Sequence, residues 1–189
     1  TKFERLELGM GNAVIERKDF FLGQLCKRGI DMSDNKFYRR VPEWPKYPED
    51  MIFEMGSGVT VDDDDALRDG SWKLSAANGG FFGSGYHHDD KGAGGPATAT
   101  FVGHLPAAGS YEVRLAVVPN ANRSRNALVR IHHAEGTAEL RADLTGAGAQ
   151  AGLLSLGTFR FPAGPAKVTV GNQGASGYVL VDAVNWQAR

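Results

Sequence analysis

The sequence predicts an all-β fold, an antiparallel β-sandwich of the jelly-roll type, preceded by an N-terminal arm that contains a short helix and a proline-rich extended connector. Three observations lead to this fold class. Short runs of alternating apolar and polar residues follow one another through the last two thirds of the chain. Segments rich in glycine, proline and asparagine separate these runs. No helical period intervenes between them, which favours antiparallel sheets over an α/β fold.

Residues 1–50 differ in composition from the rest of the chain and are predicted to form an arm or linker. Only four of the 25 glycines lie there. Residues 19–29 gather apolar side chains on one stripe and end in two basic residues and a glycine, as an amphipathic helix does. Proline then recurs at every third position from Pro42 to Pro48, a spacing that favours an extended connector. The remaining residues, 51–189, are predicted to form the β domain.

Seven runs in the β domain carry the strand signal, and they span residues 97–103, 110–118, 127–133, 137–144, 154–161, 166–170 and 177–186. The segments between them, such as PAAGS, PNANRSRN and GNQGASG, have the composition of turns. Strands at this even spacing are typical of a sandwich or jelly roll. No long unit repeats along the chain, so a propeller or solenoid is not expected.

His132 and His133 end one of these runs, and the alternation of the run predicts where each side chain points. Successive residues of a strand face opposite sides of the sheet, so the two rings are not expected to bind one metal ion together. Val129 and Ile131 share the phase of His133, which should therefore face the core and hydrogen-bond to the following turn. His132 shares the phase of Arg130 and should face solvent.

The composition argues against several classes of function. The formal net charge of −1, from 21 basic and 22 acidic residues, gives no bulk attraction to nucleic acid or to anionic membranes. No apolar run approaches the roughly 20 residues of a membrane-spanning helix. The single cysteine, Cys26, excludes an internal disulfide framework and a zinc site with several cysteine ligands.

The acidic run at residues 62–65 is the candidate metal site. Calcium prefers oxygen ligands, and we predict that Asp62, Asp64 and Asp65 supply them to a structural calcium ion. The run lacks the spacing and the distal glutamate of an EF-hand loop, and the competing interpretation is a solvated run of charge. No other cofactor is expected.

Glycine-rich loops, one of which is expected to carry His87 and His88, and exposed aromatic rings suggest a ligand site. Aromatic faces on a rigid sandwich can stack on the apolar faces of sugars, while histidine, aspartate and arginine supply polar contacts. Trp186, at the end of the last strand, is also interpreted as an exposed ring. Each aromatic residue taken singly is open to the alternative that it packs in the core, and the sequence HHDD could in principle hold a metal. The predicted ligand-binding residues are Trp72, Tyr86, His87, His88, Asp89 and Arg123.

Taken together, these stretches resemble the golvesin C-terminal-like domain, also described as the xanthan lyase carbohydrate-binding-like domain, over about residues 51–187. The resemblance rests on the order and spacing of GSWKLS, GYHHDD, ATATFVGHLPAAGSYEVRL, NRSRNALVRIHHAEGT, LSLGTFRFPAG and GYVLVDAVNW. It implies a β-sandwich accessory module, usually C-terminal in exported bacterial enzymes that include polysaccharide lyases and predicted oxidoreductases. It further implies glycan binding, an extracellular or periplasmic location, and a histidine at the position of His133.

The predicted function is therefore that of a non-catalytic, carbohydrate-binding-like module whose partners are polysaccharide and a preceding catalytic domain or another protein chain. No G-x-S-x-G, H-E-x-x-H or P-loop sequence is present, so no catalytic activity is expected from the chain by itself. Two alternatives stay open, namely an assembly subunit that docks through residues 1–50 and the C-terminal fragment of a larger secreted enzyme. A third, an enzyme that uses the histidine and aspartate loops, has the least support.

Overall fold

The computed structural model describes residues 57–189, and their strands form an antiparallel β-sandwich, which confirms the predicted fold class. The helix and the connector predicted for the arm lie outside the described residues. Within the described part, no helix has the length and apolar character needed to cross a bilayer. In chain order the elements are β1 (Val59–Asp62), the 3-10 turn η2 (Asp63–Asp65), β2 (Leu67–Asp69), β3 (Lys73–Ser75), β4 (Tyr86–His88), the 3-10 turn η3 (Asp90–Gly92), β5 (Thr98–Leu105), β6 (Gly109–Ala116), β7 (Ala127–His133), β8 (Gly136–Ala142), β9 (Leu153–Phe161), β10 (Gly164–Gly171), β11 (Leu180–Val181) and β12 (Ala183–Ala188).

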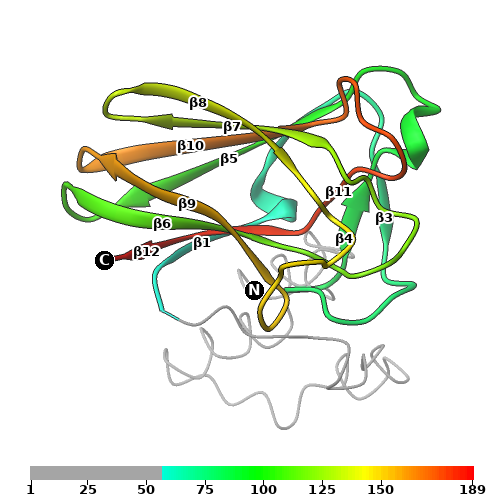
Figure 1. Ribbon diagram of the computed structural model, residues 1–189, viewed down its shortest axis with the longest axis horizontal. Helices are drawn as coiled ribbons and strands as arrows, with labels where there is room; N and C mark the ends of the chain where they lie inside the picture. The colour runs from blue at the N-terminus through cyan, green and yellow to red at the C-terminus, as the bar shows by residue number, and fades with distance from the viewer. Residues whose placement is uncertain (1–56) are drawn as a thin grey trace, which may run out of the picture. The chain divides into compact units, whose positions relative to one another are not determined.

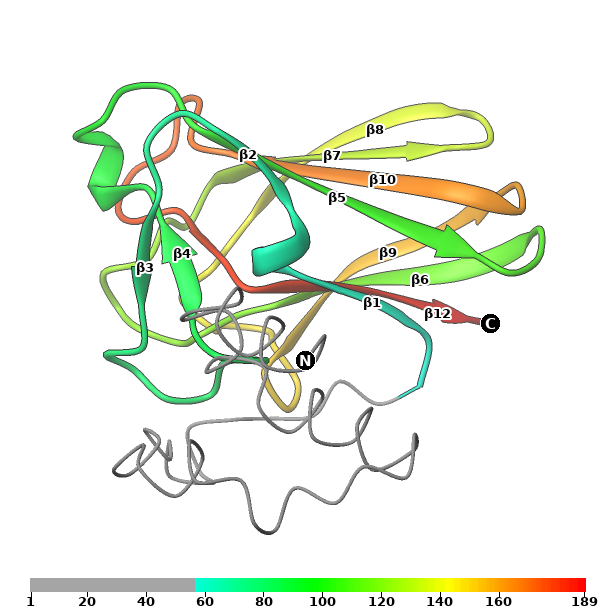
Figure 2. The ribbon, with the colours of Figure 1, turned by 180° about the vertical axis from the view of Figure 1, so that it is seen from behind.

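Two sheets form the layers of the sandwich. The four-stranded sheet has the order β1-β12-β6-β9, and the five-stranded sheet has the order β2-β5-β10-β7-β8. A smaller, three-stranded sheet has the order β11-β4-β3. Figure 1 shows β3, β4 and β11 together at the end of the sandwich that lies away from the C-terminus, and Figure 2 shows β3 and β4 there from behind.

All seven predicted runs contain strands, but the last one contains two. Residues 177–186 supply β11, which pairs with β4, and most of β12, which pairs with β1 and β6. The strands β1 to β4 are only three or four residues long, so they show too little alternation to be predicted individually. The expectation that His87 and His88 lie in a loop is wrong, because both belong to β4.

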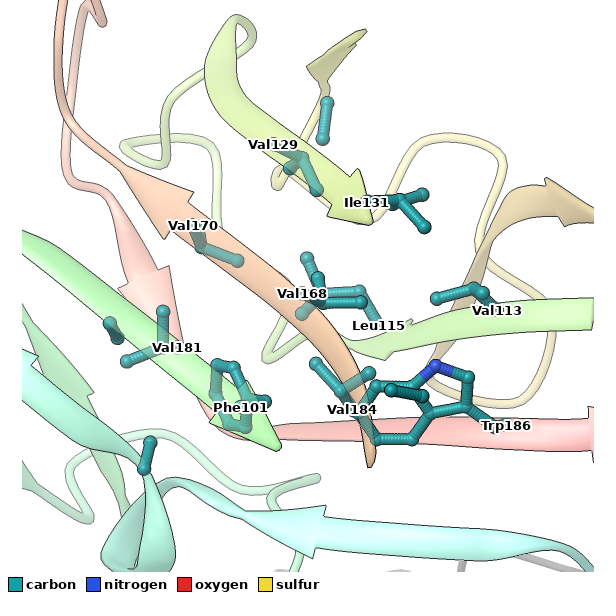
Figure 3. Packing of buried hydrophobic residues seen from close by; sticks show 14 of the residues in the cluster. Phe101, Val113, Leu115, Val129, Ile131, Val168, Val170, Val181, Val184 and Trp186 are labelled. Carbon is teal, nitrogen blue, oxygen red and sulfur yellow. The ribbon is translucent and has the colours of Figure 1, made fainter. Parts of the chain in front are cut away.

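The core lies between the two large sheets (Figure 3). Phe101 and Val168 of the five-stranded sheet and Leu115 and Trp186 of the four-stranded sheet are among its completely buried side chains. The expectation that Trp186 is exposed is therefore wrong. Gly103 of β5 makes room for this ring, since a Cβ atom at that position would lie 2.9 Å from Cζ3 of Trp186.

The phase predicted for the paired histidines is confirmed. His133 faces inward, where its ring lies 5.1 Å from that of Phe159 in the opposite sheet, and its Nδ1 accepts a hydrogen bond of 3.3 Å from the Glu135 amide in the following turn. His132 is half-buried on the outer face, where its Nδ1 lies 3.0 Å from the Thr137 hydroxyl. The alternation of strand β7 thus separates the two rings, as expected for a structural pair.

Candidate functional site

The two faces of strand β4 contact different groups of the site residues predicted from the sequence. Tyr86 and His88 project from one face of this short strand, because they are two residues apart, and His87 projects from the other. The first face contacts Arg123 and Tyr178, and the second contacts Asp63. We call the first set the Tyr86 group, which consists of Tyr86, His88, Arg123, Tyr178, Asn78 and Asn122. We call the second the aspartate cluster, which consists of Asp62, Asp63, Asp64, Asp182 and His87.

Tyr86 is buried, so the expectation of an exposed stacking ring at this position is wrong. Only 1% of the residue is exposed. Its hydroxyl oxygen lies 3.3 Å from the Ser75 hydroxyl and 3.0 Å from Nδ2 of Asn78. Burial by itself would raise the pKa of Tyr86, but the hydrogen bonds of Ser75 and Asn78 and the charge of Arg123 outweigh it and lower the pKa.

Arg123 is the charged centre of the Tyr86 group. The residue is 6% exposed, and its Cζ lies 5.4 Å from the centroid of the Tyr86 ring. Its Nε donates to the Val118 carbonyl at 3.3 Å, its Nη1 to Oδ1 of Asn122 at 3.0 Å, and its Nη2 to the Tyr86 hydroxyl at 3.3 Å. The backbone of Arg123 forms a parallel bridge with Tyr178, which fixes the loop that carries it.

His88 and Asp89 connect this group to the neighbouring loops. The half-buried His88 ring meets the Tyr178 ring edge to face at 5.6 Å, and its Nδ1 accepts from the Asp90 amide at 3.1 Å. Asp89 is 2% exposed, and its carboxylate accepts from the Val179 amide at 2.9 Å and from Nδ2 of Asn172 at 3.1 Å. Asp89 therefore joins the end of β4 to the loop between β10 and β11.

Trp72 lies apart from both groups. The residue is half-buried and packs against the main core. Its indole N–H points at two backbone carbonyls, those of Asp69 at 3.0 Å and Thr98 at 3.2 Å. The polar edge of this ring thus holds β2 and β5 together, and a ligand contact by Trp72 stays a prediction.

The aspartate cluster brings together carboxylates from three parts of the chain. Asp62 ends β1, Asp63 and Asp64 lie in η2, and Asp182 lies between β11 and β12. Ligand-capable atoms of Asp62, Asp63 and Asp182 lie within 4.8 Å of one another, as do those of Asp63, Asp64 and His87. Asp63 belongs to both sets.

Of the three aspartates predicted to bind calcium, Asp62 and Asp64 lie in the cluster, whereas Asp65 is exposed and belongs to neither set. Sequence reasoning missed two members, Asp63 and Asp182. The signal for Asp182 was available, because a single aspartate interrupts the apolar run YVLVDAV, and a completely buried carboxylate needs a specific reason.

Burial dominates the electrostatics of the cluster. It raises the pKa of Asp62 to about 8, with further increases from the hydrogen bond and charge of Asp63. It also raises the pKa of Asp63 to about 7, although the hydrogen bond with Asp62 acts in the opposite direction. The pKa of Asp182 is raised well above its usual value for the same reason. These carboxyl groups therefore either keep protons or need a bound cation to compensate their charge when they ionise together.

Several carboxylate oxygens of the cluster lie close to one another and accept hydrogen bonds from neighbouring groups. Asp63 Oδ2 lies 2.6 Å from Nδ1 of His87, and Oδ1 of Asp62 accepts from the Asp63 amide at 2.8 Å. Both carboxylate oxygens of Asp182 accept from the Phe82 amide at 3.1 Å. A Cβ atom at Gly83 would lie 2.4 Å from Oδ2 of Asp62, so this glycine lies directly against the cluster. An arrangement rich in carboxylate oxygen suits a hard divalent cation such as calcium.

Comparison with known proteins places these residues in a family context. A family model described as the golvesin C-terminal domain matches residues 59–188. A xanthan lyase of Bacillus sp. (strain GL1) is 36% identical over 137 residues, which are 69% of this chain and 14% of that protein.

Solved structures give the same picture. The structure of Paenibacillus xanthan lyase aligns with a TM-score of 0.65 at 29% identity and covers 69% of this chain and 13% of the enzyme. The isomalto-dextranase of Arthrobacter globiformis T6, complexed with panose, aligns with a TM-score of 0.50 at 18% identity, over 68% of this chain and 23% of that one, and is similar in fold alone. The chain thus spans only 14%, or about one seventh, of the length of the curated xanthan lyase.

Proposed function

The chain belongs to the golvesin C-terminal domain family, and from this membership we propose that it binds polysaccharide as a non-catalytic accessory module of a longer, exported enzyme. The observation that carries the proposal is the match to a short part of a xanthan lyase, 14% of its length. A module of this size beside a polysaccharide-cleaving domain is of use if it holds the polymer near that domain, because tethering raises the effective concentration of substrate.

The Tyr86 group is the proposed glycan contact. Sugars are recognised by hydrogen bonds to hydroxyl groups from amides, arginine and tyrosine, together with contacts to aromatic rings. Asn122 is exposed, and Asn78, His88 and Tyr178 are half-buried, so the rim of the group is open to a ligand. The buried Tyr86 and Arg123 then act as the rigid base on which these rim residues are held.

Affinity electrophoresis of the full chain tests this proposal. We expect retarded migration in gels that contain xanthan, and less retardation for the Tyr178→Ala variant, which removes a rim ring without emptying the core. Arg130→Gln is the matched surface control, because Arg130 pairs with Glu139 on the outer face of the five-stranded sheet. Unchanged mobility across xanthan and a panel of neutral and acidic polysaccharides would contradict the proposal.

We also propose that the aspartate cluster holds a structural calcium ion. Asp62, Asp63, Asp64 and Asp182 would supply carboxylate oxygens, the ligands that calcium prefers. The ion would compensate the burial and the neighbouring charges that raise the pKa values of Asp62 and Asp63. Such an ion would join β1, η2 and the β11–β12 junction, which stabilises the fold that positions β4.

Thermal unfolding in EDTA and in millimolar calcium tests the second proposal. Because an ion that binds only the folded state stabilises it by mass action, we expect the unfolding midpoint to rise with calcium. Asp64→Asn should lose most of this rise, since Asp64 is a member of the cluster but only partly buried. Asp69→Asn, an exposed residue just beyond the acidic run, should keep it. A midpoint indifferent to calcium would rule the ion out.

A further inference from the structure

Arg123 is a buried cation that has no acidic partner among residues 57–189. It is 6% exposed, and within residues 57–189 it forms no ion pair with a carboxylate. The exposed side chains of Arg125, Arg130 and Arg189, by contrast, each pair with an aspartate or glutamate. Burying a charge is costly unless an opposite charge compensates it. The buried Arg123 would therefore gain more from a carboxylate partner than the exposed arginines do.

The guanidinium group keeps unused hydrogen-bonding capacity. A guanidinium has five N–H groups, and the bonds to Val118, Asn122 and Tyr86 use one on Nε, one on Nη1 and one on Nη2. One N–H group on each terminal nitrogen therefore has no acceptor in the described part of the chain. The Tyr86 ring, 5.4 Å from Cζ, compensates the charge only in part.

The guanidinium lies one side chain below the surface. Its Nη1 bonds to Oδ1 of Asn122, a residue that is itself exposed. Asn120 and Asn78 continue this amide surface through a bond of 3.3 Å between Nδ2 of Asn120 and Oδ1 of Asn78. A ligand that meets these amides and displaces the Asn122 side chain would come next to Nη1 of Arg123.

We infer that the glycan bound by the Tyr86 group is anionic, and that Arg123 receives a carboxylate group of one of its sugar residues. A carboxylate supplies two acceptor oxygens that match two terminal N–H groups of an arginine, and it neutralises the buried charge. A neutral sugar hydroxyl would do neither. This inference rests on the proposed glycan-binding function and adds the chemical class of the ligand.

Two forms of one polymer test the inference with the unmodified chain. Isothermal titration calorimetry would compare xanthan with its carboxyl-reduced product, in which each carboxylate has become a primary alcohol. We expect binding to the reduced polymer to be weaker by about tenfold or more, the order of a charge-assisted pair. Equal affinity for both polymers would overturn the inference and leave the glycan-binding proposal standing. Binding of neither polymer would overturn both.

Two variants then locate the preference at Arg123. Asn122→Asp places an internal carboxylate on Nη1 of Arg123, so the variant should fold and lose the preference for the acidic polymer. Gln187→Glu introduces the same charge on the outer face of the four-stranded sheet and should keep the preference. Arg123→Gln should also lose it, with Arg130→Gln as its control. An Asn122→Asp chain that still prefers the acidic polymer as strongly as the unmodified chain would overturn the assignment to Arg123.

Discussion

At the scale of single residues, the packing of Trp186 depends on a neighbour without a side chain. The indole ring is completely buried between the sheets, and its N–H finds no hydrogen-bond partner among residues 57–189. Gly103 lies against the ring, so that a Cβ atom there would lie 2.9 Å from Cζ3 and 3.0 Å from Cε3 of Trp186. The first contact is shorter than carbon atoms tolerate and the second is tight, so the ring or the strand would have to shift if position 103 carried a Cβ atom.

Gly103→Ala is expected to destabilise the fold. Overpacking of a filled core typically costs about 1–3 kcal/mol, because the ring and the strand must shift to admit the extra methyl group. Urea unfolding followed by tryptophan fluorescence measures the change. Gly109→Ala is the matched control, since its Cβ atom would meet only Cε2 of Tyr111 at an ordinary 3.6 Å. Equal stability of the two variants would show that the sheets have room at Gly103.

At the scale of elements, the aspartate cluster makes the junction of β1, η2, β4 and β12 sensitive to pH. Asp62 and Asp63 have pKa values raised to about 8 and about 7 by burial. In the unfolded chain both groups ionise near pH 3.8, their ordinary value. A carboxyl group whose pKa is raised by folding contributes stability that is fully present below pH 3.8 and is lost as the pH rises through the folded value.

The metal-free protein is therefore expected to lose stability between about pH 4 and pH 8, the window set by the raised pKa values of Asp62 and Asp63. The Asp62→Asn variant should lose less stability over this range, since it has one ionisable group fewer in the cluster. The difference between the two free energies of unfolding, measured in urea with EDTA across this range, isolates Asp62 from groups that titrate in the opposite sense. His87 is one such group, because burial lowers its pKa. Parallel curves for the two proteins would contradict the raised pKa of Asp62.

At the scale of the whole molecule, the β-sandwich corresponds to a module within longer proteins. The family match covers residues 59–188, and the xanthan lyase alignment extends over 14% of that protein. A domain with its own core between two sheets can fold without its neighbours. The core found here lies between the two large sheets of the described residues.

A chain that begins at residue 51 is accordingly expected to unfold cooperatively at the same midpoint as the full chain and to bind xanthan with the same affinity. Calorimetry on the two chains measures both properties. Light scattering on the same samples addresses the alternative of an assembly subunit, because an oligomer that disappears on removal of residues 1–50 would favour docking through the arm. Loss of the unfolding transition in the shorter chain would contradict the predicted boundary.

Much of the fold was predictable because strand alternation is a local property. The run at residues 127–133 matches β7 residue for residue, and its phase places His133 inward and His132 outward. The short strands β1 to β4 were not predictable singly, because three or four residues carry too little pattern. The same limit led to the wrong placement of His87 and His88 in a loop.

The sequence by itself determined the all-β class, the positions of the longer strands and the family, since each depends on local pattern or on the order of short motifs. Only the tertiary structure decided which polar residues meet. It buries Tyr86 against Arg123, and it brings Asp182 to Asp62 and Asp63 from the far end of the chain. The physical reason is that burial and charge proximity arise from contacts between segments far apart in the sequence, and no local pattern records the partner of a residue that is distant in sequence.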